Sequence, residues 1–446
     1  MRLQSGAQVH KTLQMFCLVL LFTAVLSSCD GKKSLETTLA ETRIVPPPVT
    51  QIVPSATAIQ FTPVPTVRTP STLITLTLAP GHPTLTPTAT PPPTVTPQPP
   101  PSTPTATPAI SKVMARLPEE EIFYLDGGQF PPEIWKLNLR TLEKTRIFYN
   151  DTPGFEIGGM ALSPDKKFLA FDFSFYDPVS LQIINRSGLQ MMRTDGSELR
   201  VLMETTESDW AIGAPGWSPD GTRIAYLREY LTPGGYPPLV YLHVLDLGTG
   251  QDRVITEEGG LFSWSPRGDR IVYTGRNDHG VYVLDLRSGR RETLWEDEKL
   301  TFGWPAWQPG GEKIAVAVVV GEMRPSTSPE AGLYIMDATS RECRKLIDGD
   351  IYDISWSPDG KKLAYLVFAL RGNQLWLMDI ESGSQVKLLD KIVELGTPAW
   401  SEDGRALLLA VEEELEQPYW ISVMAIEDQS LAKLVLAETM RPYSTW

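Results

Sequence analysis

Cysteine is rare in this chain of 446 residues, which has only Cys17, Cys29 and Cys343. The first two lie in the N-terminal stretch, ahead of any globular pattern. We therefore expect no disulfide within the folded part, although an exported protein can form one. Cys343 lies between charged neighbours, and we expect it to pack against the protein rather than react.

Histidine is almost as rare, with four residues in the whole chain. Only His243 and His279 lie in the part with a globular pattern, so a three-histidine metal site is excluded there. The sequence also has no calcium-binding loop, no phosphate-binding loop and no glycine-rich dinucleotide fingerprint. We therefore expect neither a metal nor a cofactor.

Charge is nearly absent from residues 44–110, where Arg68 is the only charged residue. The same stretch holds 19 of the 39 prolines, many of them in Thr-Pro pairs. Such a segment cannot bury a core, and its prolines favour the extended polyproline II conformation. We predict that residues 29–112 form a disordered linker, either as an O-glycosylated stalk or as an inert spacer.

The N-terminus has the pattern of a signal peptide. Residues 1–28 carry Arg2, Lys11 and then an apolar run over residues 15–26, which is too short for a membrane span. The run ends in Leu26-Ser27-Ser28-Cys29, which resembles the lipobox of bacterial lipoproteins. The resemblance implies cleavage before Cys29, acylation of its thiol and a lipid anchor in the bacterial cell envelope, with the folded part outside the cytoplasm. In a two-membrane cell, the choice of membrane stays open.

Acidic residues outnumber basic ones, with 54 Asp and Glu against 40 Lys and Arg. Without residues 1–28, which contain two basic and no acidic residues, the balance is 54 against 38, a net charge of about −16. An acidic protein is a poor partner for nucleic acid or anionic lipid. We expect no nucleic acid partner, and contact with a membrane through the acyl chains only.

A short motif recurs along the globular part, which begins near residue 113. It reads Trp-Ser-Pro-Asp-Gly at residues 217–221 and 356–360, and Trp-Ser-Pro-Arg-Gly at residues 264–268. Looser copies begin at residues 162, 307 and 400. We call the first residue of each copy its key residue, and successive key residues are 55, 47, 43, 49 and 44 positions apart. Each motif predicts a tight turn between two strands, and four-stranded repeats of this length are typical of β-propellers.

A second hairpin follows each turn. Its first strand is represented by residues 281–285, 333–337 and 375–379, and its last strand by residues 291–295 and 385–389. Each repeat therefore supplies four strands, A to D. The Trp-Ser-Pro-Asp-Gly turn with a downstream Tyr-x-x-Asp strand resembles the WD-like propeller repeats of the TolB type, over residues 113–446.

The predicted fold is all-β, a propeller of seven four-stranded blades. Six repeats carry an A–B turn, and an extra B, C and D set precedes them at residues 122–125, 134–138 and 145–148. Trp446 lies 46 residues after Trp400, in register with the key residues. We predict that the C-terminal strand supplies the missing strand A and closes the ring, which then has no open sheet edge. The alternative is six blades and a stray hairpin.

The connections between strands predict a binding face. In a propeller, the A–B and C–D turns share one face, and the B–C and D–A loops share the other. Here the longest connections are B–C loops, from residues 173 to 187, 229 to 239, 320 to 332 and 412 to 419, and the D–A loops are acidic. We expect a binding rim on that face, although ordinary solvated loop charge is the alternative explanation. The candidate rim residues are Phe175, Tyr176, Glu207, Asp209, Trp210, Tyr230, Tyr236, Glu296, Asp297, Glu298 and Arg324.

No catalytic residue stands out. The repeated Asp of the turn is expected to bond local backbone N–H groups. Residues 216–219 approach a nucleophile elbow, but Asp220 replaces the final glycine and Ser218 belongs to the repeat turn. Prolyl-oligopeptidase-like enzymes carry similar propellers with an attached hydrolase domain, for which we expect no room in this chain.

The sequence favours binding over catalysis. TolB-type proteins pair their propeller with a separate N-terminal domain and work with a peptidoglycan-associated lipoprotein, whereas this chain has the Pro/Thr-rich linker in that place. We expect a non-catalytic monomer that binds a protein, peptide or glycan through its long-loop face. The alternative is a propeller enzyme that acts on glycans, as a lyase or hydrolase, with carboxylates in the channel mouth. A close pair of channel-facing carboxylates with a raised pKa would favour it.

Overall fold

The computed structural model describes residues 121–126, 131–176, 183–206, 210–230, 239–275, 279–320, 326, 328–369, 372–392, 394–395, 397–412, 419–437 and 444–445. These residues form β-strands and turns, and none of them lies in a helix long and apolar enough to span a bilayer. Residues 53–106 lie outside the described residues. So do Cys29 and the boundaries predicted at residues 28 and 112.

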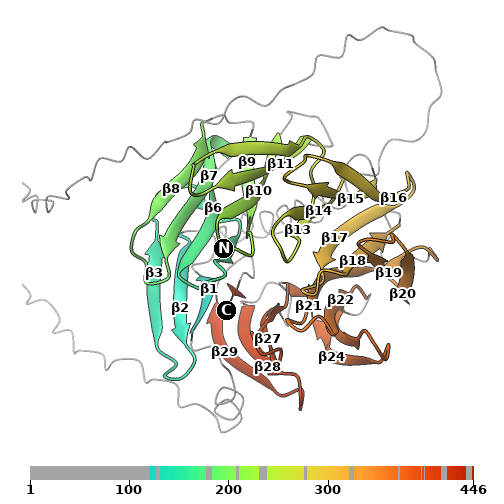
Figure 1. Cartoon of the computed structure of the whole chain (residues 1–446). Helices are drawn as coiled ribbons and strands as arrows, with labels where there is room; N and C mark the ends of the chain where they lie inside the picture. The colour runs from blue at the N-terminus through green and yellow to red at the C-terminus, as the bar shows by residue number, and fades with distance from the viewer. Residues whose placement is uncertain are drawn as a thin grey trace, which may run out of the picture. The chain divides into compact units, whose positions relative to one another are not determined.

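Seven antiparallel sheets make up the rest, each sheet being one blade (Figure 1). Blade I contains β4 (Phe155–Glu156) and β5 (Met160–Leu162) as strand A, then β6 (Phe168–Tyr176), β7 (Ile183–Arg193) and β8 (Arg200–Thr205). Blade II contains β9 (Trp210–Trp217), β10 (Arg223–Tyr230), β11 (Leu239–Asp246) and β12 (Asp252–Thr256). Blade III contains β13 (Phe262–Trp264), β14 (Arg270–Thr274), β15 (Gly280–Asp285) and β16 (Arg291–Glu296). Blade IV contains β17 (Thr301–Trp307), β18 (Lys313–Val319), β19 (Gly332–Asp337) and β20 (Cys343–Asp348).

The remaining blades complete the ring. Blade V contains β21 (Ile351–Trp356), β22 (Lys362–Val367), β23 (Asn373–Asp379) and β24 (Gln385–Ile392). Blade VI contains β25 (Glu394–Leu395) and β26 (Ala399–Trp400) as strand A, then β27 (Ala406–Glu412), β28 (Tyr419–Ala425) and β29 (Leu431–Ala437). Blade VII contains β30 (Ser444–Thr445), β1 (Glu121–Asp126), β2 (Glu133–Asn138) and β3 (Lys144–Tyr149).

The C-terminal strand closes the ring, as predicted. In β30, Ser444 pairs with Tyr124 and Thr445 pairs with Phe123, so the sheet order of blade VII is β3-β2-β1-β30. β30 also contacts β5 of blade I and β27 of blade VI. In Figure 1 the red strands of blade VI lie beside the blue-green strands of blade VII. Seven blades are therefore confirmed and six are excluded, while Trp446 itself lies outside the described residues.

The hydrophobic core lies between the blades and not within them. Alternate residues of each B strand face the two neighbouring blades, so B strands such as β18 and β27 are buried along almost their whole length. Tyr226 packs in the cluster shared with blade I, and its neighbour Leu227 packs in the cluster shared with blade III. D strands such as β16 alternate with solvent instead. Cys343 lies on the D strand β20 and is exposed, so the prediction that it packs is wrong.

Tryptophan side chains link successive blades. The indole Nε1 of each of four key tryptophans donates to a backbone oxygen of the preceding blade, at the residue just before that blade's key residue. The pairs are Trp217 with Ala161 (3.0 Å), Trp264 with Gly216 (3.1 Å), Trp356 with Ala306 (3.0 Å) and Trp400 with Ser355 (3.2 Å). Trp307 differs, because its Nε1 donates to Gly311 of its own turn (3.3 Å).

Removal of residues 440–446 is expected to lower the melting temperature of the whole propeller by several degrees, in one cooperative transition. The deletion opens the ring and leaves the inner edge of β1 unpaired, and about 1 kcal/mol of lost stability moves the melting temperature by roughly 2–4 °C in a domain of about 200 residues. Calorimetry is the measurement. A full-length control with alanine at positions 444 and 445 keeps the backbone pairing and should melt near the wild-type temperature. Equal melting temperatures for the deletion and the wild type would contradict closure by β30.

Candidate functional site

The long connections follow strand B and lie on one face, because the strands of each blade alternate in direction. Strand β10 ends at Tyr230 and β11 begins at Leu239, and the corresponding connections in blades IV and VI run between residues 319 and 332 and between 412 and 419. The connection in blade I is shorter than predicted, because β6 continues to Tyr176 and β7 begins at Ile183. We call this side the long-loop face.

The predicted rim residues are only partly described. Glu207, Asp209, Tyr236 and Arg324 lie outside the described residues, and only the backbone is described for Tyr176 and Trp210. Glu296 and Glu298 are exposed, whereas Asp297 and Tyr230 are half-buried. These described residues belong to B–C or D–A connections or to the strand ends beside them, which the topology places on the long-loop face. Their role in binding stays a prediction.

Phe175 is not the free aromatic side chain that we expected. Its ring meets that of Phe155 edge-on at 5.3 Å and that of Phe173 at 6.2 Å, and the Arg186 guanidinium lies 5.7 Å from it. Such aromatic contacts stabilise the packing where β4 pairs with β6. The sequence could not show this, because the partner Phe155 belongs to a two-residue strand.

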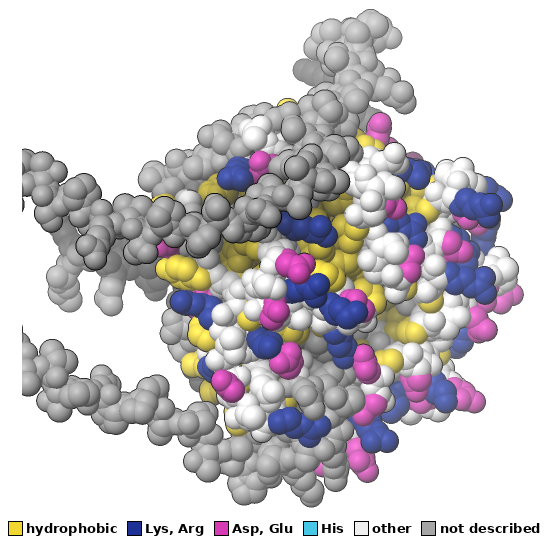
Figure 2. Space-filling model, turned by 60° about the vertical axis from the view of Figure 1, so that its left-hand side comes forward, with side chains coloured by type: hydrophobic (Ala, Val, Ile, Leu, Met, Phe, Trp, Pro, Cys, Tyr) yellow, Lys and Arg dark blue, Asp and Glu magenta, His cyan; other side chains and the backbone are white. Residues whose placement is uncertain are grey.

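Several of the acidic loop residues have basic partners. Arg186 donates to Glu204 (2.7 Å), and Lys345 lies 2.6 Å from Asp348. Figure 2 shows Lys and Arg side chains interspersed with Asp and Glu on the side of the molecule that it views, without a patch of one sign. These acidic loop residues are therefore solvated and paired locally with basic residues. Acidic residues with a functional role are to be sought nearer the axis.

Most of the A strands, which are the innermost strands of the blades, have a β-bulge at the same position along the axis. The A strands of neighbouring blades contact one another, which places them around the axis. In blades I, II, IV, V and VI, strand A carries one residue more than the facing stretch of strand B. A β-bulge of this kind bends the strand and re-aims a side chain, and bulges are frequent beside active sites. Two bulge residues, Ala214 and Asp353, have positive φ angles of 54° and 49°.

The bulges turn side chains toward the axis. Ala214, Trp304, Asp353 and Thr397 each lie three positions before a key residue, in blades II, IV, V and VI. Ala214, Trp304 and Thr397 are exposed and Asp353 is half-buried. Neighbouring blades cover both faces of an inner strand and strand B covers its outer edge, so its exposed side chains face the central channel. We call Trp304, Asp353 and Thr397 the channel layer.

A second layer lies one step closer to the long-loop face, at the start of each A strand. Here the residue six before the key residue pairs with the residue twelve after it, as in Glu156 with Ser174, Ala211 with Glu229 and Glu394 with Glu412. In blade V the corresponding contact is the Phe368 N–H donating to the Asp350 carbonyl oxygen (2.9 Å). We call this level the mouth layer, and its acidic residues are Glu156, Glu229, Asp350, Glu394 and Glu412.

Two of these carboxylates are buried in adjacent blades. Asp350 is 1% exposed and Glu412 is 7% exposed. Asp350 Oδ2 accepts from the Ser326 N–H (2.5 Å), which ties the B–C loop of blade IV to the start of β21. Its Oδ1 is buried and has no hydrogen-bond partner in the part of the chain that the structure describes. A buried carboxylate oxygen left without a donor is unusual in a native protein and marks a place where a ligand or water completes the site.

Sequence reasoning missed this layer, although a signal was present. Glu156, Asp350 and Glu394 each lie six residues before a key residue, at 162, 356 and 400. Alignment of the repeats on their key residues would have shown this recurrence of acids. The sequence pattern did not indicate a function for Trp304, Asp353 or Glu412, because their positions around the axis depend on the bulge.

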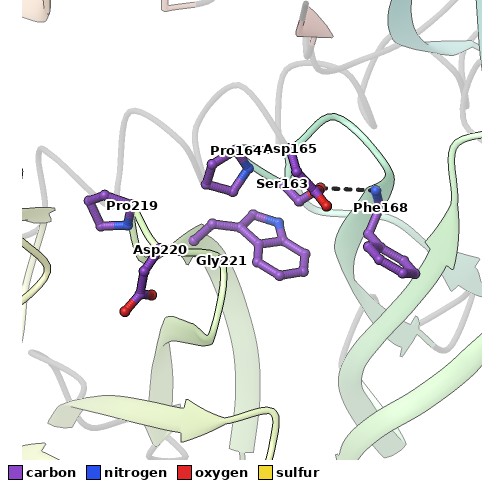
Figure 3. A pocket seen from close by; sticks show the side chains of 8 residues that line it. Ser163, Pro164, Asp165, Phe168, Pro219, Asp220 and Gly221 are labelled. Atoms are coloured by element: carbon purple, nitrogen blue, oxygen red, sulfur yellow. Dashed lines mark hydrogen bonds between the residues drawn. The ribbon is translucent and has the colours of Figure 1, made fainter.

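The opposite face carries the tight A–B turns, and a shallow hollow lies between the first two of them. Ser163, Asp165, Phe168, Pro219 and Asp220 contribute to its lining, and its volume is about 320 Å³ (Figure 3). The turn carboxylates are already engaged, since the hydroxyls of Ser163 and Ser218 donate to Asp165 (2.7 Å) and Asp220 (2.6 Å). These hydrogen bonds show the structural role that was expected for the repeated Asp.

The third turn, at residues 264–268, provides an acceptor for its serine hydroxyl from a different position. In blade III, Arg267 occupies the position of the repeated Asp, and the Ser265 hydroxyl donates instead to Asp269 (2.9 Å). The substitution moves the acceptor by two residues and keeps the turn. This exchange agrees with a structural need for a carboxylate in the turn and with no chemical task for it.

The two histidines of the propeller are structural in their contacts. His243 Nδ1 lies 2.9 Å from Asp252, which also accepts from the Tyr226 hydroxyl (2.9 Å), and the imidazole is buried. His279 Nδ1 lies 2.9 Å from the Leu300 carbonyl oxygen. No Ser-His-Asp set forms among the described residues, and no cluster of three or more His, Cys, Asp or Glu residues there is placed to hold a metal.

No protein-family model matches the sequence. Two curated relatives share sequence with it: "Uncharacterized peptidase YuxL" of Bacillus subtilis is 24% identical over 220 residues, and "Dipeptidyl-peptidase 5" of Porphyromonas gingivalis is 26% identical over 268 residues. The matches cover 47% and 56% of this chain but only 31% and 36% of the relatives. The chain thus spans about a third of the length of the curated relatives it matches.

Solved propellers confirm the fold. An oligogalacturonate lyase in complex with manganese superposes with a TM-score of 0.54 at 16% identity, covering 70% of this chain and 87% of the lyase. A prolyl endopeptidase gives 0.52 at 12% identity, covering 75% of this chain and 53% of the other. TolB from Acinetobacter baumannii gives 0.45 at 17% identity, covering 76% and 85%. The chain is a seven-bladed β-propeller of antiparallel blades, which is the fold that the TolB-type repeat predicted.

The expectation of a non-catalytic binding protein is wrong. The curated relatives that share sequence with this chain are named as peptidases, which are enzymes. The prediction failed because it searched for catalytic motifs along the sequence, whereas Asp350 and Glu412 reach the same level of the ring only through the pairing of the strands.

The pH dependence of stability tests the role assigned to the turn carboxylates. Burial alone would raise the pKa of Asp220, but hydrogen bonds from Ser218 and Thr222 outweigh it and lower the pKa from 3.8 to about 2. The stabilisation is therefore complete above about pH 4 and lost as the pH falls through about 2. Because the side chain is half-exposed, solvent screening reduces the effect to about 1 kcal/mol. Denaturant unfolding should show Asp220→Asn less stable than wild type at pH 5, with the gap closing toward pH 2.5. A gap that stays constant with pH would contradict the assignment.

Proposed function

We propose that this chain is an enzyme that cleaves glycans at the channel mouth of its long-loop face, with Asp350 and Glu412 as acid–base carboxylates. The observation that carries the proposal is the burial of these two carboxylates at one level of adjacent blades. Burial of a carboxylate is costly, so the retention of two buried carboxylates at this level of the ring supports a task in chemistry.

Two carboxylates are sufficient for glycoside chemistry. In hydrolysis, one carboxylic acid donates a proton to the leaving oxygen as the glycosidic C–O bond breaks. The other carboxylate accepts a proton from the water whose oxygen attacks the anomeric carbon, or attacks that carbon itself. In elimination, a carboxylate instead removes a proton from carbon. The backbone of Glu394 is the register partner of Glu412 in the same blade.

Peptide hydrolysis is the second candidate function. It is favoured by the sequence similarity to two relatives named as peptidases, which covers about half of this chain. In that case the mouth layer would receive an extended peptide, and its carboxylates would attract a basic terminus or side chain. The two candidates predict different substrates for the same face.

We further propose that the enzyme is held at a membrane through an acylated Cys29, outside the cytoplasm. The Leu-Ser-Ser-Cys sequence at the end of the apolar run supports this. Residues 44–110, with a proline content unsuited to a core, would then separate the propeller from the lipid. An anchored enzyme of this kind meets polymers of the cell envelope or its surroundings.

Asp350→Asn and Glu412→Gln are each expected to lower glycan cleavage at least about 100-fold, since general acid–base groups typically contribute factors of roughly 10²–10⁴. The assay follows reducing-end release from a panel of neutral and acidic oligosaccharides. Its pH–rate profile measures whether one carboxyl group has the raised pKa that an acid catalyst needs. Glu381→Gln, which changes an exposed carboxylate in the C–D turn of blade V on the opposite face, is the control and should keep wild-type activity.

The same purified protein should be tested on a peptide panel. Cleavage of peptides that depends on Asp350 and Glu412, with no cleavage of any oligosaccharide, would replace the first candidate by the second. Wild-type activity in both variants would contradict the assignment of the mouth layer, whichever polymer is cleaved.

Membrane-extracted protein is expected to begin at Cys29 with a diacylglyceryl group on its thiol. The signal is cut where the apolar run ends, and the thiol that follows is the acceptor. Intact-mass and peptide mass spectrometry make the measurement, with Cys29→Ser as the control that stays unacylated. Recovery of residues 1–28, or of unmodified Cys29 in a soluble fraction, would overturn the proposed anchor.

A further inference from the structure

We infer that the channel layer is a sugar subsite for neutral or N-acetylated residues, and that it excludes uronic acids. The inference rests on the proposed function, since it names the substrate class of that same mouth. The inference also decides between hydrolysis and elimination. Elimination needs a C–H bond made acidic by an adjacent carboxyl group, as in a uronate. A site for neutral sugars is a site for hydrolysis.

Trp304 supplies the platform of the subsite. It lies in the bulge of β17, and its side chain is 36% exposed although the strand is innermost in the ring. An indole held at the inner edge of a blade presents an apolar face to the channel. Pyranose rings bear patches of C–H groups on one side, and these stack on aromatic faces while the hydroxyl groups stay available for hydrogen bonds.

Asp353 and Thr397 supply polar contacts at the same level in the next two blades. The Thr397 hydroxyl donates to Asp353 Oδ1 (3.0 Å), and the φ angle of Asp353 is 49°. An aspartate held in the left-handed region at a bulge indicates a constraint that the surrounding structure imposes, and such constraints gather at functional sites. A carboxylate accepts up to about four hydrogen bonds, so it suits the several hydroxyl donors of a sugar.

The charges on the inner strands disfavour anionic sugars, although the exposed Lys299 lies in the connection that precedes β17. A ligand that reaches Trp304 from the long-loop face passes the mouth layer, which contains the buried Asp350 and Glu412. None of the described A strands contains Lys or Arg. On the B strands, Arg228 is the basic residue at the mouth level among the described residues, and it is 1% exposed in the packing between blades. A uronate would therefore meet carboxylates without an accessible cation on these strands.

The test measures binding separately from cleavage. Isothermal titration with the Glu412→Gln protein uses two probes of equal length, tetra-N-acetylchitotetraose and tetragalacturonate. The neutral probe should bind at least 10-fold more tightly than the acidic one. Trp304→Ala should weaken its binding at least 10-fold, and Trp304→Phe should restore most of it. Tyr149→Ala, which removes a more exposed aromatic side chain from the outermost strand β3, should change nothing.

The outcomes separate this inference from the proposed function. Binding of the neutral probe that depends on Trp304, without turnover by the wild type, would support the subsite and overturn the proposed cleavage of this sugar. Turnover with a KM unaffected by Trp304→Ala would support the enzyme and overturn the subsite. Equal or tighter binding of tetragalacturonate, or no binding of either probe, would also overturn the subsite.

Discussion

Closure of the ring is the constraint on which the rest of this structure depends. Two residues of β30 pair with β1 and supply the strand that blade VII lacks, so no inner edge stays open. Once the ring is closed, seven A strands must share the space around one axis. Five of them carry a bulge at the same height, which lets the strand bend and turns side chains inward. The mouth and channel layers are a product of this geometry.

The environment distinguishes structural carboxylates from functional ones in this protein. Asp220 and the other turn aspartates accept hydrogen bonds from a serine hydroxyl and from nearby N–H groups, which accounts for their repetition. Asp350 is fully buried, yet one of its oxygens has no partner within the described residues. The same residue type therefore serves the turns on one face of the ring, and we propose that it serves chemistry on the other.

The fold was predictable because its signals are local and repeated. A Trp-Ser-Pro-Asp-Gly turn specifies its own hairpin, and the spacing of Trp446 from Trp400 indicated where the last strand would lie. The site was less predictable, because a bulge adds one residue to strand A and shifts every position beyond it. Charge counts along the loops therefore pointed to Glu296 and its neighbours, whereas the buried Asp350 and Glu412 lie at the channel mouth. Phe175 was misjudged for a related reason, since its aromatic partners come from another strand.

The central claim is that substrate is held where the inner strands of blades IV, V and VI meet the long-loop face. A crystal structure of the Glu412→Gln protein with a bound oligosaccharide tests this most directly. The account predicts sugar density over the Trp304 ring, with a glycosidic bond at the level of Asp350 and residue 412. Density confined to the hollow between the A–B turns, or to the outer edges of the blades, would contradict it.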